Sequence, residues 1–123
     1  MAHIVEIKTE VRDAAAVRAA CQRLELPPPV QGAHRLFSGR VSGLGVELPA
    51  WRYPVVCQLE TGEIRYDNFD GHWGPQQHLD RLLQAYAVEM AKIEARRKGH
   101  ACTEQQLADG SIKLTVSVQG GAA

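Results

Sequence analysis

Cysteine is scarce in this sequence, and the few cysteines present follow no recognised pattern. Cys21, Cys57 and Cys102 lie far apart, and none belongs to a Cys-x-x-Cys motif. Three thiols are one short of a four-cysteine iron–sulfur site, and an odd number argues against a closed disulfide framework. Each cysteine lies in a segment that we expect to be a helix or a strand. We therefore predict small buried residues that stay reduced in a cytoplasmic compartment.

An excess of charge of one sign and a long apolar run are also missing. The 14 basic and 14 acidic residues cancel, so no net field steers the 123-residue chain onto nucleic acid or an anionic membrane. No apolar run approaches the length of a membrane span, and residues 1–8 alternate in polarity, unlike a signal peptide. We expect a cytoplasmic protein without nucleic-acid or membrane partners. It should have one domain over residues 1–119 and a flexible tail over residues 120–123.

Two segments have the spacing of apolar residues that is typical of amphipathic helices. The first, residues 14–24, follows Asp13, a good N-cap residue, and we expect the three prolines at 27–29 to end it. The second covers residues 75–97 and begins with a proline at an early helical position. Gly99 follows a basic last turn and is the expected C-terminal cap.

The remaining patterned segments predict strands. Thr61-Gly62 and Asp109-Gly110 each indicate a tight turn within a hairpin, and Ser38-Gly39 and Ser42-Gly43 indicate further turns. The resulting order is β-α-β-β-β-β-α-β-β. It predicts an α+β fold in which a mainly antiparallel sheet carries two helices on one face. The segments expected to be strands are 3–11, 34–37, 44–48, 53–59, 63–66, 101–107 and 112–118.

The stretch Tyr66–Pro75, between a predicted strand and the long helix, has the most unusual composition. Aromatic residues, two carboxylates and a histidine stand among glycines and a proline. A structural interpretation is that Asp67 and Asp70 bond their own loop backbone while Phe69 and Trp73 hold the turn to the core. Another interpretation is that the turn contacts a ligand or partner. The residues proposed for such contact are Tyr66, Asp67, Asp70, His72 and Trp73.

A metal site is a further alternative at this turn. Asp67, Asp70, His72 and His78 offer oxygen and nitrogen ligands, which bind a divalent ion if the fold brings them together. However, the two histidines lack the i, i+4 spacing of a helical pair. A calcium-loop alignment also fails, because it places Tyr66 where the first carboxylate belongs. We therefore assign no metal ligand.

Catalytic motifs are not recognisable elsewhere in the chain. Gly43-Leu44-Gly45 lacks the third glycine of a dinucleotide-binding fingerprint, and no serine has the glycine-framed setting of a nucleophile elbow. We therefore assign no catalytic residue and no cofactor.

Several short motifs spread along the chain resemble one family of uncharacterised proteins. That family is a domain of unknown function and includes a conserved hypothetical reading frame of algal chloroplast genomes. The resemblance implies a small stand-alone intracellular domain and carries no established activity or catalytic residue. The matching segments are residues 1–13, Tyr66-Asp67, Asp70-x-x-Trp73-Gly74, Gln84-Ala85-Tyr86-Ala87, Ala95-Arg96-x-x-Gly99 and residues 109–114.

Two functional hypotheses of different classes follow. The one we favour is a non-enzymatic interaction module or accessory subunit that docks through a sheet edge or its long helix. It predicts a homo-oligomer or a complex with a protein partner, and no bound cofactor. The alternative is a ligand- or metal-binding domain, conceivably catalytic, in which Tyr66, His72 and Trp73 line a pocket.

Overall fold

The computed structural model, which describes residues 5–8 and 10–117, has the order of helices and strands that the sequence predicts. The fold is α+β, and all described strand pairs are antiparallel. The predicted flexible tail at 120–123 lies outside the described residues. The elements are β1 (Val5–Lys8), α1 (Ala14–Arg23), β2 (Val30–Leu36), β3 (Gly39–Val46), β4 (Val55–Gln58), β5 (Glu63–Tyr66), α2 (Gln76–Arg97), β6 (Ala101–Gln106) and β7 (Ile112–Ser117).

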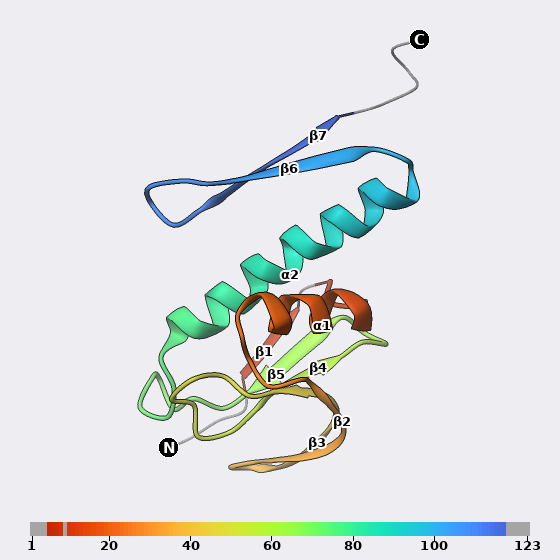
Figure 1. Cartoon of the computed structure of the whole chain (residues 1–123). Coiled ribbons are helices and arrows are strands. Elements are labelled where there is room, and N and C mark those ends of the chain that lie inside the picture. The colour runs from red at the N-terminus through yellow and green to blue at the C-terminus, as the bar shows by residue number, and fades with distance from the viewer. Residues whose placement is uncertain (1–4, 9, 118–123) are drawn as a thin grey trace.

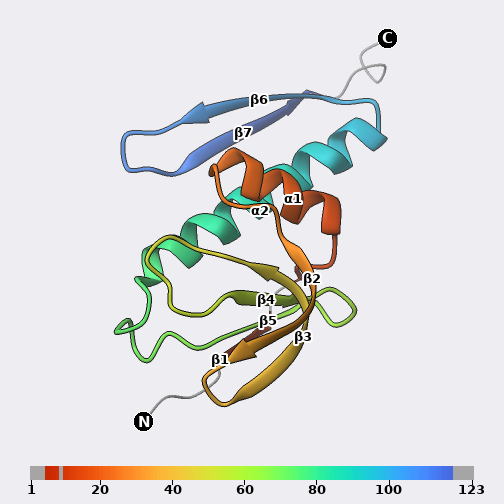
Figure 2. The ribbon, with the colours of Figure 1, turned by 60° about the horizontal axis from the view of Figure 1, so that its bottom comes forward.

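These elements form three layers (Figure 1). The first is a five-stranded sheet in the order β1-β5-β4-β3-β2. Helices α1 and α2 pack on one face of this sheet, as predicted (Figure 2). The third layer is β6–β7, a separate two-stranded sheet on the far side of α2, which the sequence did not predict. We call this third layer the ribbon.

The main core lies between the sheet and the two helices. Alternate residues of the central strands point toward the helices, as the period of a strand requires. Tyr86 of α2 also fixes the approach to α1, because its hydroxyl accepts hydrogen bonds from the amides of Arg12 (3.1 Å) and Asp13 (3.2 Å). The buried members of this core are Val11, Ala16, Val17, Ala20, Cys21, Leu44, Val46, Leu48, Val55, Cys57, Ile64, Tyr66, Leu79, Leu82, Ala85 and Tyr86.

The helix ends agree with the sequence in part. The Asp13 carboxylate accepts a hydrogen bond from the Ala16 amide at 3.0 Å, which confirms the predicted N-cap. Gly99 follows α2 with φ of 74°, as expected for a cap. Helix α1, in contrast, ends at Arg23, before the prolines. Its chain reversal is made by Glu25, whose φ is 58°.

The region between residues 30 and 46 differs most from expectation. The structure has one long hairpin, β2–β3, instead of two short strands separated by turns. Ser42-Gly43 lies inside β3 and makes no turn. Two of the three glycines of β3 serve close packing instead: a Cβ at Gly43 would come within 2.7 Å of the Cys57 carbonyl oxygen, and one at Gly45 would overlap the His34 ring.

Two of the three cysteines are buried, as the sequence predicts. Cys21 and Cys57 are buried, Cys102 is half-buried, and all three are free. Burial raises the pKa of the Cys57 thiol to about 12, so this group is a neutral core residue at physiological pH. Among the described residues, no helix combines the length and apolar character that crossing a bilayer requires.

Candidate interaction surface

The Tyr66–Pro75 turn has a strained but internally bonded backbone. Its residues Phe69–Gly71 have φ values of 47°, 51° and 90°. This left-handed conformation costs a residue other than glycine about 1 kcal/mol or more. The carbonyl of Asn68 accepts hydrogen bonds from the amides of Gly71 (3.0 Å) and Trp73 (2.9 Å), which close the turn. These hydrogen bonds within the turn help to hold Phe69 and Asp70 in a conformation that neither residue prefers by itself.

The side chain of Asn68 provides part of that support. It is buried, and its amide nitrogen donates to the Gly74 carbonyl and to the Gln76 side-chain oxygen, both at 3.3 Å. We had expected Asp67 and Asp70 to bond the loop backbone. The structure gives this role to Asn68, because its amide can donate to carbonyl groups, whereas an ionised carboxylate only accepts.

The segment Trp51–Tyr53 holds the turn from outside. The Trp51 indole nitrogen donates to the Pro75 carbonyl at 2.9 Å, and the Arg52 amide donates to the Trp73 carbonyl at 2.7 Å. The Trp51 ring lies so close to Gly74 that a Cβ there would overlap it. These contacts fix the turn between α2 and the loop before β4.

Trp73 lies at the centre of a cluster of rings. Its ring centroid is 5.0 Å from that of Phe69, 5.1 Å from that of Phe37 and 5.6 Å from that of Tyr53. The Arg52 guanidinium lies 5.3 Å from the Trp73 ring centroid, within the range of a cation–π contact. We call these residues, Phe37, Arg52, Tyr53, Phe69 and Trp73, the aromatic surface.

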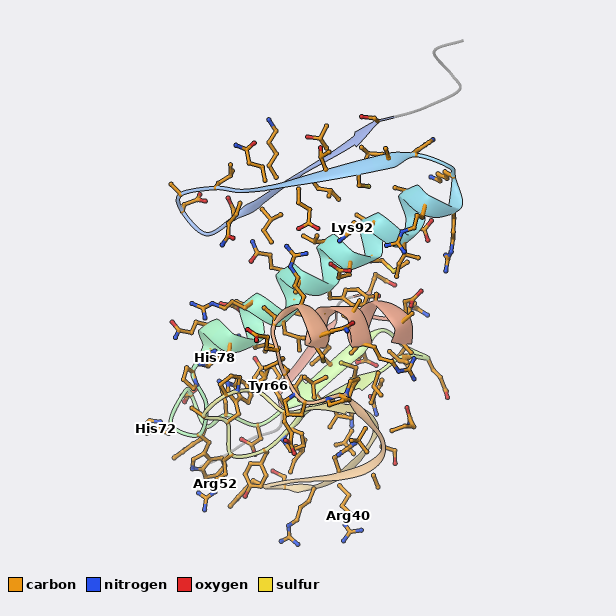
Figure 3. All side chains as sticks on the ribbon, in the orientation of Figure 1. Arg40, Arg52, Tyr66, His72, His78 and Lys92 are labelled. Atoms are coloured by element: carbon orange, nitrogen blue, oxygen red, sulfur yellow. The ribbon has the colours of Figure 1, made fainter. Side chains whose placement is uncertain are left out.

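Much of this aromatic surface remains accessible to solvent. Phe37, in the turn of the β2–β3 hairpin, is 53% exposed even though it contacts Trp73. Figure 3 shows Arg52 and His72 at the end of the molecule away from the ribbon, whereas Lys92 lies on the ribbon side of α2. A large exposed apolar residue at the edge of a ring cluster is the feature that needs a functional explanation.

The surroundings of the aromatic surface are basic. Arg35 and Arg40 face each other across the β2–β3 hairpin on either side of Phe37, and both are exposed. Within the described part of the chain, no carboxylate forms an ion pair with either of them or with Arg52. Three unneutralised cations therefore flank the rings.

Asp67 differs from every other carboxylate of the described chain. It is 0% exposed, and neither of its carboxylate oxygens has a hydrogen-bond partner. Burying a polar group without a partner costs free energy, because nothing in the protein replaces its lost hydration. Such a group is either a local destabilising element or one half of an interaction that a ligand completes.

The structure separates the residues that the sequence grouped at this turn. Tyr66 belongs to the main core, where burial, the largest cause, raises the pKa of its hydroxyl. Asp67 follows it, directly after the end of β5, and is also buried. Asp70 and His72 are exposed, and Trp73 is half-buried. His72 and Trp73 share a neighbour, since the rings of both contact Phe69.

The sequence offered a pocket lined by Tyr66, His72 and Trp73 as an alternative. Three surface cavities of the described chain are lined by residues outside the turn. One of them, of about 110 Å³, lies between the end of α1 and the start of α2 and includes His78. Among residues 5–8 and 10–117, no three His, Cys, Asp or Glu side chains come close enough to hold a metal ion.

Sequence reasoning missed three members of the aromatic surface, namely Phe37, Arg52 and Tyr53. Their contacts with Trp73 bridge 36, 21 and 20 positions of the chain, so no local pattern reveals them. The one available signal was composition, because an aromatic residue in a tight turn and a Trp-Arg-Tyr run before Pro54 are unusual in loops.

The chain matches no protein-family model, no curated protein and no solved structure.

Proposed function

We propose that this chain is a non-enzymatic interaction module or accessory subunit of the cytoplasm. In this proposal it binds an acidic segment of a protein partner through the aromatic surface, associates with itself, and does not bind nucleic acid. The observation that carries the proposal is the 53% exposed Phe37, which contacts Trp73 at a centroid distance of 5.1 Å. Membership of the uncharacterised family that the sequence resembles is part of the same proposal.

The composition and rigidity of the aromatic surface support a docking role. Tryptophan, tyrosine and arginine dominate the binding energy of known protein interfaces, because they bury large areas and carry few rotatable bonds. The backbone beneath Trp73 is already fixed by the Arg52 amide and the Asn68 carbonyl. A partner therefore binds without first ordering the loop, which keeps the entropic cost of association low.

The charge around the aromatic surface supports an acidic partner. Arg35, Arg40 and Arg52 are exposed and have no ion-pair partner in the described part of the chain. An aspartate- or glutamate-rich segment would neutralise them at the rim while its apolar residues contact Phe37 and Trp73. Charges at a rim mainly raise the association rate and exclude basic competitors.

Binding to a library of fluorescent Asp/Glu-rich peptides that also contain aromatic residues tests this proposal. We expect Phe37→Ala to weaken the best peptide about tenfold or more, and Arg52→Glu to weaken it with a reduced dependence on salt. Both residues are exposed, so circular dichroism should show an unchanged fold. Val30→Ala is the matched control, since Val30 is 60% exposed but lies outside the aromatic surface.

Two results would overturn the proposed partner class. One is equal peptide binding by the wild-type chain, the Phe37→Ala variant and the Arg52→Glu variant. The other is tight binding of labelled oligo(dT) that Phe37→Ala abolishes, because bases also stack on aromatic rings beside arginine. In the second case the same surface would be a single-stranded nucleic-acid site.

A second candidate function is ligand binding at the turn, and one observation favours it. The unpartnered Asp67 carboxylate could pair with a cationic group of a ligand once the strained turn opens. Native mass spectrometry of the purified full chain, with metal analysis, tests this candidate. A bound metal or small molecule at unit stoichiometry that Asp67→Asn removes would support it, and a bare chain in both preparations would refute it.

A further inference from the structure

The ribbon is less protected from solvent than the five-stranded sheet. Its strands β6 and β7 have six residues each and pair only with one another. A two-stranded ribbon is marginally stable in water unless a helix or further strands cover it. Here α2 covers one face, yet no residue of either strand is buried. Both outer edges lack a pairing strand within the described part of the chain.

Hydrogen-bonded and non-hydrogen-bonded pairs alternate along the ribbon. This alternation determines which residues of β7 direct their backbone amide and carbonyl groups toward its outer edge. The Leu107 amide donates to the Ser111 carbonyl at 2.8 Å, one position beyond the Gln106–Ile112 pair. Gln106 and Ile112 are therefore a non-hydrogen-bonded pair, and every second pair along the ribbon shares this state. It follows that Ile112, Leu114 and Val116 direct their amide and carbonyl groups away from β6.

The same three residues carry the apolar side chains of β7. By strand alternation, Ile112, Leu114 and Val116 share the face of the ribbon that is turned toward α2. Val116 is 42% exposed, one of the few large apolar side chains of the described chain that solvent reaches. The strand has no proline and one charge, Lys113, so it lacks most devices by which edge strands resist pairing.

We propose that two copies of this chain associate by antiparallel pairing of β7 with β7, around a two-fold axis at Leu114. Leu114 then faces Leu114 of the second copy, and Ile112 faces Val116 on either side. All three residues present outward backbone groups, so the pairing forms about six hydrogen bonds and a four-stranded sheet. This surface deepens the self-association included in the proposed function, and it is separate from the aromatic surface.

Charge favours this pairing over the alternatives. In the proposed register, Lys113 faces the neutral Thr115 of the second copy. The equivalent symmetric pairing of β6 would oppose Glu104 to Glu104, because Glu104 has the matching outward phase in that strand. Glu104 is also already engaged, since it forms ion pairs with Arg23 and with Lys92 (2.8 Å).

Charge variants at Thr115 test the proposed register in the full-length chain. Thr115→Lys places two lysine–lysine pairs across the interface, and Thr115→Glu places two glutamate–lysine pairs there. We expect sedimentation equilibrium to show a dimer dissociation constant about fivefold higher for the first variant and about fivefold lower for the second. Thr103→Lys is the matched control, because Thr103 pairs with Thr115 on the same exposed face but lies on β6.

Amide exchange at two protein concentrations provides a second readout. Dimer formation should slow exchange at Ile112, Leu114 and Val116. Lys113 and Thr115, whose amides already bond β6, should remain protected at both concentrations. A wild-type chain that stays monomeric, a dimer insensitive to the Thr115 variants, or an equal effect of Thr103→Lys would each overturn the proposal. Peptide binding by Thr115→Lys and dimerisation of Phe37→Ala should both match the wild type, which separates this proposal from the acidic-partner one.

Discussion

The body of this protein, meaning the five-stranded sheet with α1 and α2, and the ribbon are stabilised in different ways. The body encloses side chains such as Ile64 and Leu79 that are inaccessible to solvent. The ribbon has no buried residue, and Glu104 connects it to the helices through Arg23 and Lys92. Apolar burial is insensitive to pH and cooperative, whereas ion pairs near the surface depend on both pH and salt. The ribbon should therefore open without unfolding the body.

Truncation of Leu79 should have the largest effect, because it creates a cavity in the body. We expect Leu79→Ala to lower the free energy of unfolding by about 3 kcal/mol, the middle of the range for buried leucines. Leu114→Ala is the matched variant in the ribbon, where a half-buried leucine should cost less than about 1 kcal/mol. Urea denaturation followed by tryptophan fluorescence measures both. Equal losses at the two positions would mean that body and ribbon unfold as one unit.

Asp67 is the exception within the body, and its replacement should raise stability. Asp67→Asn keeps the size of the side chain and replaces a buried carboxyl group whose two oxygens have no hydrogen-bond partner. We expect the free energy of unfolding at pH 7 to rise by about 1–2 kcal/mol, because a neutral amide costs less to bury than a carboxylate. Asp70→Asn, at an exposed position of the same turn, should change it by less than about 0.5 kcal/mol. A loss of stability in Asp67→Asn would show that the carboxylate has a stabilising partner.

The features that the sequence predicted correctly depend on contacts between residues close together in the chain. The features that it missed depend on contacts between distant segments. Asp13 and Gly99 were predicted as helix caps because their signal lies within one helical turn of the residues that they serve. The order of elements followed from periodicity in the same way. Gly43 of β3 was mistaken for a turn residue, because the group that it packs against, the Cys57 carbonyl, comes from the neighbouring strand β4.

The candidate site was predictable only in part for the same reason. Trp73 was named from the sequence, yet its ring neighbours Phe37 and Tyr53 come from distant segments. Tyr66 and Asp67 were placed in the site because they are adjacent in sequence to the turn, yet Tyr66 ends β5 and packs in the main core, outside the aromatic surface. The separate ribbon was also missed, since nothing in an alternating pattern indicates which sheet a strand joins.

Removal of the Glu104 charge should loosen the ribbon while the body remains folded. Glu104→Gln eliminates the ion pairs with Arg23 and Lys92. We expect the ribbon to lose about 1 kcal/mol of local stability. This value is modest because the ion pairs are partly exposed to solvent. Hydrogen exchange of the Lys113 and Thr115 amides should accelerate about fivefold. Exchange in the central strand β4 should be unchanged, and acceleration there would contradict the independence of the two regions.

The same carboxylate predicts how the ribbon responds to acid. Hydrogen bonds from Arg23 and then Lys92, the two largest causes, lower the pKa of Glu104 from 4.5 to about 2. A group whose pKa is lower in the folded state stabilises that state fully above its unfolded pKa. That contribution is lost as the pH falls from about 4.5 to about 2. Methyl NMR signals of Leu114 should shift over this interval in the wild type and stay constant in Glu104→Gln.

The smallest expected change in the free energy of unfolding concerns the C-terminal ends of the two helices. The end of α1 leads to the β2–β3 hairpin, and the end of α2 leads to the ribbon. After α1, the amides of Glu25 and Leu26 bond the carbonyls of Gln22 (3.1 Å) and Cys21 (2.8 Å). After α2, the amides of Gly99 and His100 bond the carbonyls of Arg96 (3.0 Å) and Ala95 (2.8 Å) in the same pattern. The left-handed position is thus held by a glutamate in one helix and by a glycine in the other.

This difference predicts opposite effects of substitution at the two ends. Glu25→Gly should raise the free energy of unfolding by about 0.5 kcal/mol, because the relief of left-handed strain exceeds the extra backbone entropy of glycine in the unfolded chain. Gly99→Ala should lower it by about 1 kcal/mol, since alanine meets the strain that glycine avoids. Urea midpoints of the two variants measure both changes. If Glu25→Gly proves destabilising, the Glu25 side chain must contribute a stabilising contact that offsets its backbone strain.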